Sequence, residues 1–167
     1  PGGQTVHRGV VTPLIADRHF SIRVRLSQPA HGEGVLFAIG DVTGGLVMWI
    51  ETGQLHLFYN GFGEWTRATP LAMPAGEQVV RLDYEALGKR QGRARLAIDG
   101  GAANDFQPMS PTLMNGMHEG LDIGLDRRAP VDWELFERKG AFAYSGTIHE
   151  LLIESGPMAP GSGFGTG

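Results

Sequence analysis

Apolar and polar residues alternate along much of the chain, most clearly between residues 34 and 70. There the pattern predicts consecutive strands separated by glycine turns, with Thr52 and Gly53 at the tip of a two-residue hairpin. In that register one side of the hairpin is apolar and is predicted to face the core: Leu46, Met48, Ile50, Leu55, Leu57 and Tyr59. The other side mixes rings, an imidazole and a carboxylate: Val47, Trp49, Glu51, Gln54, His56 and Phe58. We expect any function of this hairpin to lie on that second side.

Two strands are predicted before the hairpin. Residues 20–26 alternate between apolar side chains and polar ones, and the polar set includes Arg23 and Arg25. Residues 35–39 are apolar at every position and lie between two glycines, which is typical of a strand covered on both faces. The first strand is therefore predicted to expose its arginines, and the second to lie centrally in a sheet.

More strands are predicted after the hairpin. Residues 77–85 and 93–99 form a second hairpin pattern, in which opposite charges pair across a solvent face. Strands are also predicted at 121–126 and 144–154, whereas residues 104–120 have no clear period. About ten short strands with no convincing amphipathic helix predict an all-β chain, a two-sheet antiparallel β-sandwich.

The length and composition of the chain favour one domain. The chain has 167 residues, of which 41% are hydrophobic and 19% charged, and its 26 Gly and 10 Pro favour turns and strands. We assign residues 1–18 to an N-terminal segment that is a linker or an edge strand, residues 19–155 to the sandwich, and residues 156–167 to a flexible Gly/Pro-rich tail.

Charge and cysteine content exclude several kinds of function. A net charge of −4, with no run of Lys or Arg, gives no basic surface for nucleic acid. No stretch approaches the roughly 20 apolar residues that span a membrane, so we expect a soluble chain, and its compartment stays open. The absence of cysteine excludes disulfides, thiolate zinc sites and cysteine nucleophiles.

Catalytic patterns are sparse in the sequence. There is no G-x-S-x-G motif, and the six histidines show neither H-E-x-x-H nor another paired zinc spacing. Asp83 and Glu85 have the alternating spacing that glycosidases of the β-sandwich type use for their two carboxylates. Because Arg81, Arg93 and Arg95 are predicted on the same face, a solvated network of ion pairs is the favoured interpretation of these two acids.

A short acidic stretch offers oxygen ligands for a cation. Four carboxylates fall within thirteen residues, partly in a loop, which suits calcium, although no EF-hand spacing is present. They are Asp122, Asp126, Asp132 and Glu134. A polar loop at the edge of the sandwich is the favoured interpretation, calcium binding is the open alternative, and no cofactor is expected.

The main candidate for ligand binding is the second side of the first hairpin. If the turn after Tyr59 holds four residues, Tyr59 pairs with Glu64, Phe58 with Trp65 and His56 with Arg67. One face then carries the predicted ligand-binding residues Trp49, Glu51, His56, Phe58, Trp65 and Arg67. Sugars bind such faces through flat rings and polar side chains, and we name this the aromatic face. Burial of these rings is the favoured alternative, with Phe58 or Trp65 beneath residues 127–140.

Four segments together resemble one known kind of domain. They are EGVLFAIGDVTGGLVMWIETGQLHLFYNGFG from Glu33, MPAGEQVVRLDYEALGKRQGRARLAIDG from Met73, LDIGLDRRAPVDWE from Leu121 and FAYSGTIHELLIES from Phe142. In order and spacing they resemble the C-terminal β-sandwich of large bacterial arylsulfatases, a jelly roll of the concanavalin A-like or laminin-G-like type. The resemblance covers most of residues 33–155.

The resemblance implies a non-catalytic accessory domain with a structural or substrate-entrance role. Its implied partner is the catalytic sulfatase domain of the same parent chain. Sulfatases need a Cys or Ser in a C/S-x-P-x-R motif, and Ser110-Pro111-Thr112 does not fit it, so no catalytic residue is carried over and this chain by itself is not expected to be an enzyme. The alternative is a free-standing carbohydrate-binding module that uses the aromatic face, and a third hypothesis is a glycosidase with Asp83 and Glu85.

Overall fold

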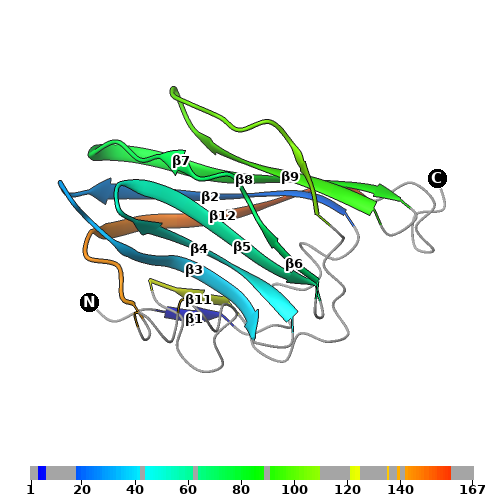
Figure 1. Ribbon diagram of the computed structural model, residues 1–167, viewed down its shortest axis with the longest axis horizontal. Coiled ribbons are helices and arrows are strands. Elements are labelled where there is room, and N and C mark those ends of the chain that lie inside the picture. Colours follow the sequence, from blue (N-terminus) through cyan, green and yellow to red (C-terminus); the bar gives the residue numbers. More distant parts are fainter. Residues whose placement is uncertain are drawn as a thin grey trace.

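The computed structural model describes residues 4–6, 18–41, 44–61, 64–88, 91–109, 121–124, 135, 139 and 142–158. Most of these residues lie in strands, and the strands form two antiparallel sheets stacked face to face (Figure 1). The predicted all-β sandwich is therefore confirmed. In the described part of the chain, no helix is long and apolar enough to cross a membrane.

Each sheet combines consecutive strands of the chain with strands that are remote in sequence. The seven-stranded sheet has the order β1 (Gln4–Val6), β11 (Leu121–Ile123), β3 (Gly34–Asp41), β4 (Gly44–Glu51), β5 (Gln54–Gly61) and β6 (Glu64–Arg67), with β7 (Leu71–Ala72) also paired to β5. The five-stranded sheet has the order β10 (Gln107–Pro108), β9 (Gln91–Ile98), β8 (Gly76–Gly88), β2 (Arg18–Gln28) and β12 (Thr147–Met158). The last strand ends at Met158, so residues 156–158 of the segment assigned to the tail belong to β12.

The first hairpin has the register expected from its turn. Ile50 pairs with Leu55, and Trp49 pairs with His56. Thr52 and Gly53 both have positive φ angles, of 53° and 74°, as a two-residue type I′ turn requires. Thr52 N also donates a hydrogen bond to Glu33 Oε2 at 2.8 Å, which ties this turn to the start of β3.

The connection from β5 to β6 differs from the expectation. Gly61 pairs with Glu64, and Phe58 pairs with Arg67, so the predicted four-residue turn and its pairing of Phe58 with Trp65 are wrong by two residues. Asn60 and Gly61 remain in β5 as strand residues, and Asn60 is buried. Because the shift is an even number of residues, Arg67 still lies on the same face as Phe58.

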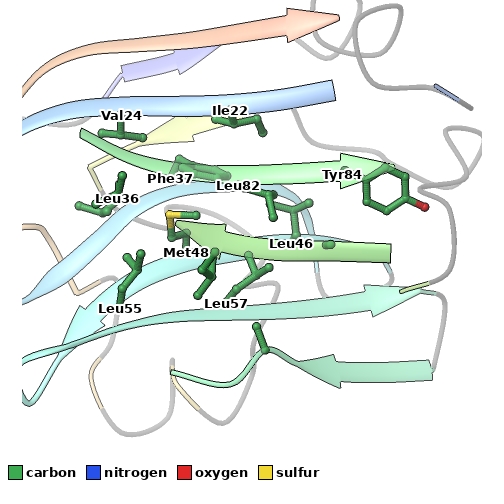
Figure 2. Close-up of a cluster of buried hydrophobic side chains, with 14 of the residues drawn as sticks. Ile22, Val24, Leu36, Phe37, Leu46, Met48, Leu55, Leu57, Leu82 and Tyr84 are labelled. Atoms are coloured by element: carbon green, nitrogen blue, oxygen red, sulfur yellow. The ribbon is translucent and has the colours of Figure 1, made fainter. Parts of the chain in front are cut away.

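The main core fills the space between the sheets. Leu57 from the seven-stranded sheet and Leu82 from the five-stranded sheet are both almost fully buried in it, as Figure 2 shows for a cluster of labelled side chains. The predicted core side of the first hairpin is confirmed in full: Leu46, Met48, Ile50, Leu55, Leu57 and Tyr59. Burial of each such aliphatic side chain stabilises the fold by about 1.5–3 kcal/mol.

The segment before β12 bridges the two sheets. Val35 N donates to the carbonyl oxygen of Phe142 at 2.7 Å, which attaches this segment to β3. Tyr144 Oη donates to Gln28 Oε1 at 2.5 Å at the end of β2, and burial raises the pKa of Tyr144 to about 12. Gly34 has a φ of +131°, and a side chain there would collide with the backbone of Tyr144. The bridge therefore places residue 142 beside the outer face of the seven-stranded sheet.

Candidate functional site

The rings of the aromatic face are buried. Trp49 and Phe58 are each only 2% exposed on the outer side of the seven-stranded sheet. They belong to a second apolar cluster with Leu135, and Phe142 packs against it. Burial, the favoured interpretation, is therefore confirmed for these two rings, and Phe58 shares its cluster with Leu135 from residues 127–140.

Polar groups surround the Trp49 indole. Its Nε1 donates to Glu51 Oε1 at 3.1 Å. The His56 ring is stacked on it, with centroids 5.0 Å apart and planes 11° from parallel, and His56 Nε2 lies 3.3 Å from the carbonyl oxygen of Glu51. The imidazole therefore covers one face of the indole. A sugar that stacked on Trp49 would need that face.

Arg67 lies at the exposed rim of the same face. Its guanidinium carbon is 4.5 Å from the centroid of the Phe58 ring, a cation–π contact. Trp65 pairs with Asn60, and its side chain lies outside the described residues. The structure thus brings Trp49, Glu51 and His56 together, and places Phe58 beneath Arg67. Ligand binding by this face stays a prediction.

The outer side of the five-stranded sheet is different in character. Asp83 lies near its centre and accepts hydrogen bonds from Ser21 Oγ at 2.9 Å, Arg81 Nε at 2.8 Å and Arg95 Nε at 2.9 Å. Burial by itself raises the pKa of Asp83, but the hydrogen bonds from Arg95, Arg81 and Ser21 outweigh it and hold the pKa below its usual value. Asp83 is therefore a carboxylate at neutral pH.

Further ion pairs extend this network over four strands. They join Arg81 to Asp99 at 2.5 Å, Arg93 to Glu85 at 3.1 Å, Arg23 to Glu154 at 3.1 Å and Arg23 to Asp99 at 3.9 Å. The pairing of opposite charges across the second hairpin is thereby confirmed, as is the ion-pair interpretation of Asp83 and Glu85. A glycosidase needs one carboxyl protonated as its general acid, and the lowered pKa of Asp83 opposes that role.

A cleft of about 370 Å³ opens on this charged face, where β2 begins and β12 ends. Its walls include His19, Asp83, Glu85, Arg95, Phe106 and Glu154. The guanidinium carbons of Arg93 and Arg95 lie 4.8 and 4.7 Å from the centroid of the Phe106 ring. Sequence reasoning missed this cleft, because Phe106 belongs to the stretch without a clear period.

One Ser–His contact on the charged face superficially resembles a nucleophile and its base. Ser27 Oγ lies 2.7 Å from His149 Nε2, but the Ser27 hydroxyl donates its proton to Glu77 Oε1. Glu77 Oε2 also approaches Nε2, at 3.4 Å, instead of orienting the ring from Nδ1. His149 must then donate to Ser27, so the geometry is that of a surface hydrogen-bond chain and not of a triad.

Metal ligands do not gather in the described residues. Within those ranges, no group of three or more His, Asp or Glu side chains is arranged to hold a metal ion. Of the predicted calcium ligands, Asp122 is described only as a residue of β11. Asp126, Asp132 and Glu134 lie outside the described residues. Calcium binding by this loop stays a prediction.

Comparisons with known proteins define the fold. No protein-family model matches the chain, and no curated protein matches it. Among solved structures, domains LG4–5 of the mouse laminin α1 chain are 12% identical with a TM-score of 0.66, over 94% of this chain and 40% of that one. The LG1–3 region of the laminin α2 chain is 14% identical with a TM-score of 0.64, over 95% of this chain and 31% of that one.

A third match is similar over nearly its whole length. The CBM40 module of the Ruminococcus gnavus IT-sialidase, solved with α2,3-sialyllactose, is 15% identical with a TM-score of 0.57, over 95% of this chain and 92% of that one. The chain has a concanavalin A-like β-sandwich fold. At these identities the similarity concerns the fold alone. None of the comparisons links the chain to arylsulfatases, so that part of the resemblance stays a prediction.

Proposed function

We propose that the chain is a non-catalytic accessory β-sandwich that works beside the catalytic domain of a larger hydrolase. The main support is that the residues best suited to catalysis are engaged in other interactions. Asp83 and Glu85 are both held in ion pairs with arginines, and Ser27 donates its proton away from His149. Such groups stabilise a surface but are poorly placed to transfer protons to a substrate.

The finer form of this proposal makes the parent enzyme an arylsulfatase-like sulfuric ester hydrolase. Its support is the sequence resemblance between residues 33 and 155. In that case the sandwich stabilises the catalytic domain or forms part of its substrate entrance. We expect the 167-residue chain alone to hydrolyse no aryl sulfate, and the full gene product to do so in a chromogenic aryl sulfate assay. A gene that encodes no sulfatase-type domain would overturn the sulfatase form of the proposal.

Carbohydrate binding is the second function that we propose. Two observations favour it: the similarity to a CBM40 module over 92% of that module, and the cleft on the charged face, where ring and polar groups meet. A binding module needs a surface of this kind and no catalytic group. The test is a glycan array probed with the labelled 167-residue chain. We expect selective binding to a subset of glycans, and an array without any bound glycan would contradict this function.

A further inference from the structure

The cleft holds hydrogen-bonding groups that the ion-pair network does not use. Glu85 accepts from Arg93 through Oε2 alone, and Glu154 contacts Arg23 through Oε1 alone. Within the described part of the chain, Glu85 Oε1, Glu154 Oε2 and the His19 ring have no hydrogen-bond partner. Two carboxylate oxygens and one imidazole thus have no partner among the described residues, and such groups can accept hydrogen bonds from ligand hydroxyls.

The ion pairs hold these groups in place. Arg93 restrains Glu85 and Arg23 restrains Glu154, each with an N···O distance of 3.1 Å. Carboxylates that are fixed before a ligand arrives lose less conformational freedom on binding than free surface side chains do. The network thus lowers, by the modest amount that exposed ion pairs supply, the conformational freedom that these carboxylates lose when a small polar ligand binds.

Phe106 gives the cleft an apolar surface. Its half-buried ring contacts the guanidinium groups of Arg93 and Arg95, which extend from β9. Arg95 donates to Asp83 through Nε, and no described residue accepts from its terminal nitrogens. A flat ring beside guanidinium donors and carboxylate acceptors is complementary to a pyranose, which has C–H groups on one side and hydroxyls at its edge.

The charge in the cleft selects among sugars. Asp83, Glu85 and Glu154 line it and each is paired with at least one arginine, so the cleft has no excess of positive charge, and Glu85 and Glu154 each keep one carboxylate oxygen outside these pairs. A carboxylated or sulfated sugar would bring a further negative charge close to these carboxylates. That repulsion weakens binding relative to a sugar without charge.

We infer that this cleft is the binding site for a neutral pyranoside, with Phe106 beneath the ring and with Glu85, Glu154 and His19 hydrogen-bonded to its hydroxyls. The inference rests on the carbohydrate-binding function proposed above. It assigns that function to the charged face, and it excludes the aromatic face as the primary site.

The test begins with the whole 167-residue chain on an array that contains neutral, sialylated and sulfated glycans. Lactose and 3′-sialyllactose form a matched pair, because they differ only in the acidic residue. The best neutral oligosaccharide is then titrated by calorimetry into the wild-type chain and into Phe106→Ala and Glu85→Ala. We expect the affinity to fall about tenfold or more in each variant, the loss expected for removal of one good contact.

Two control variants separate a binding effect from a folding effect. Arg25→Ala removes an exposed arginine on the same sheet whose side chain forms no ion pair with a described residue, and Arg67→Ala alters the rim of the aromatic face. Both should bind the oligosaccharide like the wild type, and thermal melts should show that all four variants are folded. A variant that is not folded is replaced by Glu154→Gln, which leaves the ring contacts of Phe106 in place.

The outcomes distinguish the inference from the function on which it rests. Absence of binding to any glycan overturns both. Binding that survives Phe106→Ala and Glu85→Ala but is lost in Arg67→Ala keeps the carbohydrate function and overturns the cleft. Tighter binding of 3′-sialyllactose than of lactose overturns the neutral-ligand assignment.

Discussion

The two outer faces of the sandwich both arise from alternation along strands, but one face is covered and the other is exposed. On the seven-stranded sheet, Trp49 and Phe58 are 2% exposed because Leu135 and Phe142 pack over them. On the five-stranded sheet, the corresponding positions carry ion pairs around Asp83 and an open cleft. The first face is a small second core, and the second is a structured polar surface.

The type of side chain alone therefore does not identify a binding face. Rings next to an imidazole and a carboxylate have the composition of a sugar site, but a ring that is buried cannot stack on a ligand. Paired charges have the composition of an inert surface, but their unused oxygens can accept hydrogen bonds from a ligand. Whether a face is covered depends on segments that are remote in sequence.

The largest expected effect is on stability, at Trp49. Replacing it with alanine should reduce the free energy of unfolding by about 3–5 kcal/mol, because the change leaves a cavity in the second core. Urea denaturation followed by circular dichroism measures this loss. Unfolding of Trp49→Ala at the same urea concentration as the wild type would show that Trp49 is not buried, because loss of an exposed ring costs little stability.

The next effect is at Asp83, whose removal tests the ion-pair network. Asp83→Asn should lower the free energy of unfolding by about 1–2 kcal/mol at pH 7, because Arg81 and Arg95 lose a charged acceptor at a partly exposed site. The same denaturation measured as a function of pH shows whether the loss depends on the ionisation of Asp83.

The sign of that pH dependence follows from the lowered pKa of Asp83. Its stabilising contribution is present above the unfolded value of about 3.9 and is lost as the pH falls through the lower folded value. Wild type and Asp83→Asn should therefore differ at pH 7 and converge below about pH 4. A constant difference down to pH 2 would show that the hydrogen bonds to Asp83 do not set its ionisation.

The smallest effect is expected at Arg67, on the rim of the aromatic face. Its guanidinium contacts the Phe58 ring but remains exposed, so Arg67→Ala should cost less than about 1 kcal/mol. Thermal unfolding compared with the wild type measures this. A loss as large as that of Trp49→Ala would mean that the rim is part of the second core.

Local patterns predicted a large share of the fold. Strand alternation and the Thr52-Gly53 turn were sufficient for the register of the first hairpin. The charge pattern of the second hairpin predicted that opposite charges pair across it, and in the structure Asp83 lies opposite Arg95. These features depend on residues near one another in sequence. By contrast, Asn60-Gly61 has the composition of a hairpin turn but continues β5, because Asn60 is buried and paired in the sheet.

Much less of the candidate site could be predicted from the sequence. Phe106 reaches the cleft because backbone hydrogen bonds from Asn104 N to Leu96 O and from Met109 N to Gly92 O return its segment to β9. No periodicity in residues 104–120 indicates that return. Coverage of Trp49 likewise depends on Leu135, which is 86 residues away in sequence (135 − 49 = 86). Contacts of this range are set by the whole fold.

Hydroxyl-radical footprinting, read residue by residue through mass spectrometry, tests the difference between the two faces most directly. It needs no ligand and reports the accessibility of each ring in the folded chain. The structure predicts strong protection of Trp49 and Phe58 relative to the unfolded chain, and clear labelling of Phe106 in the cleft. Labelling of Trp49 as strong as in the unfolded chain, with Phe106 protected, would contradict the account.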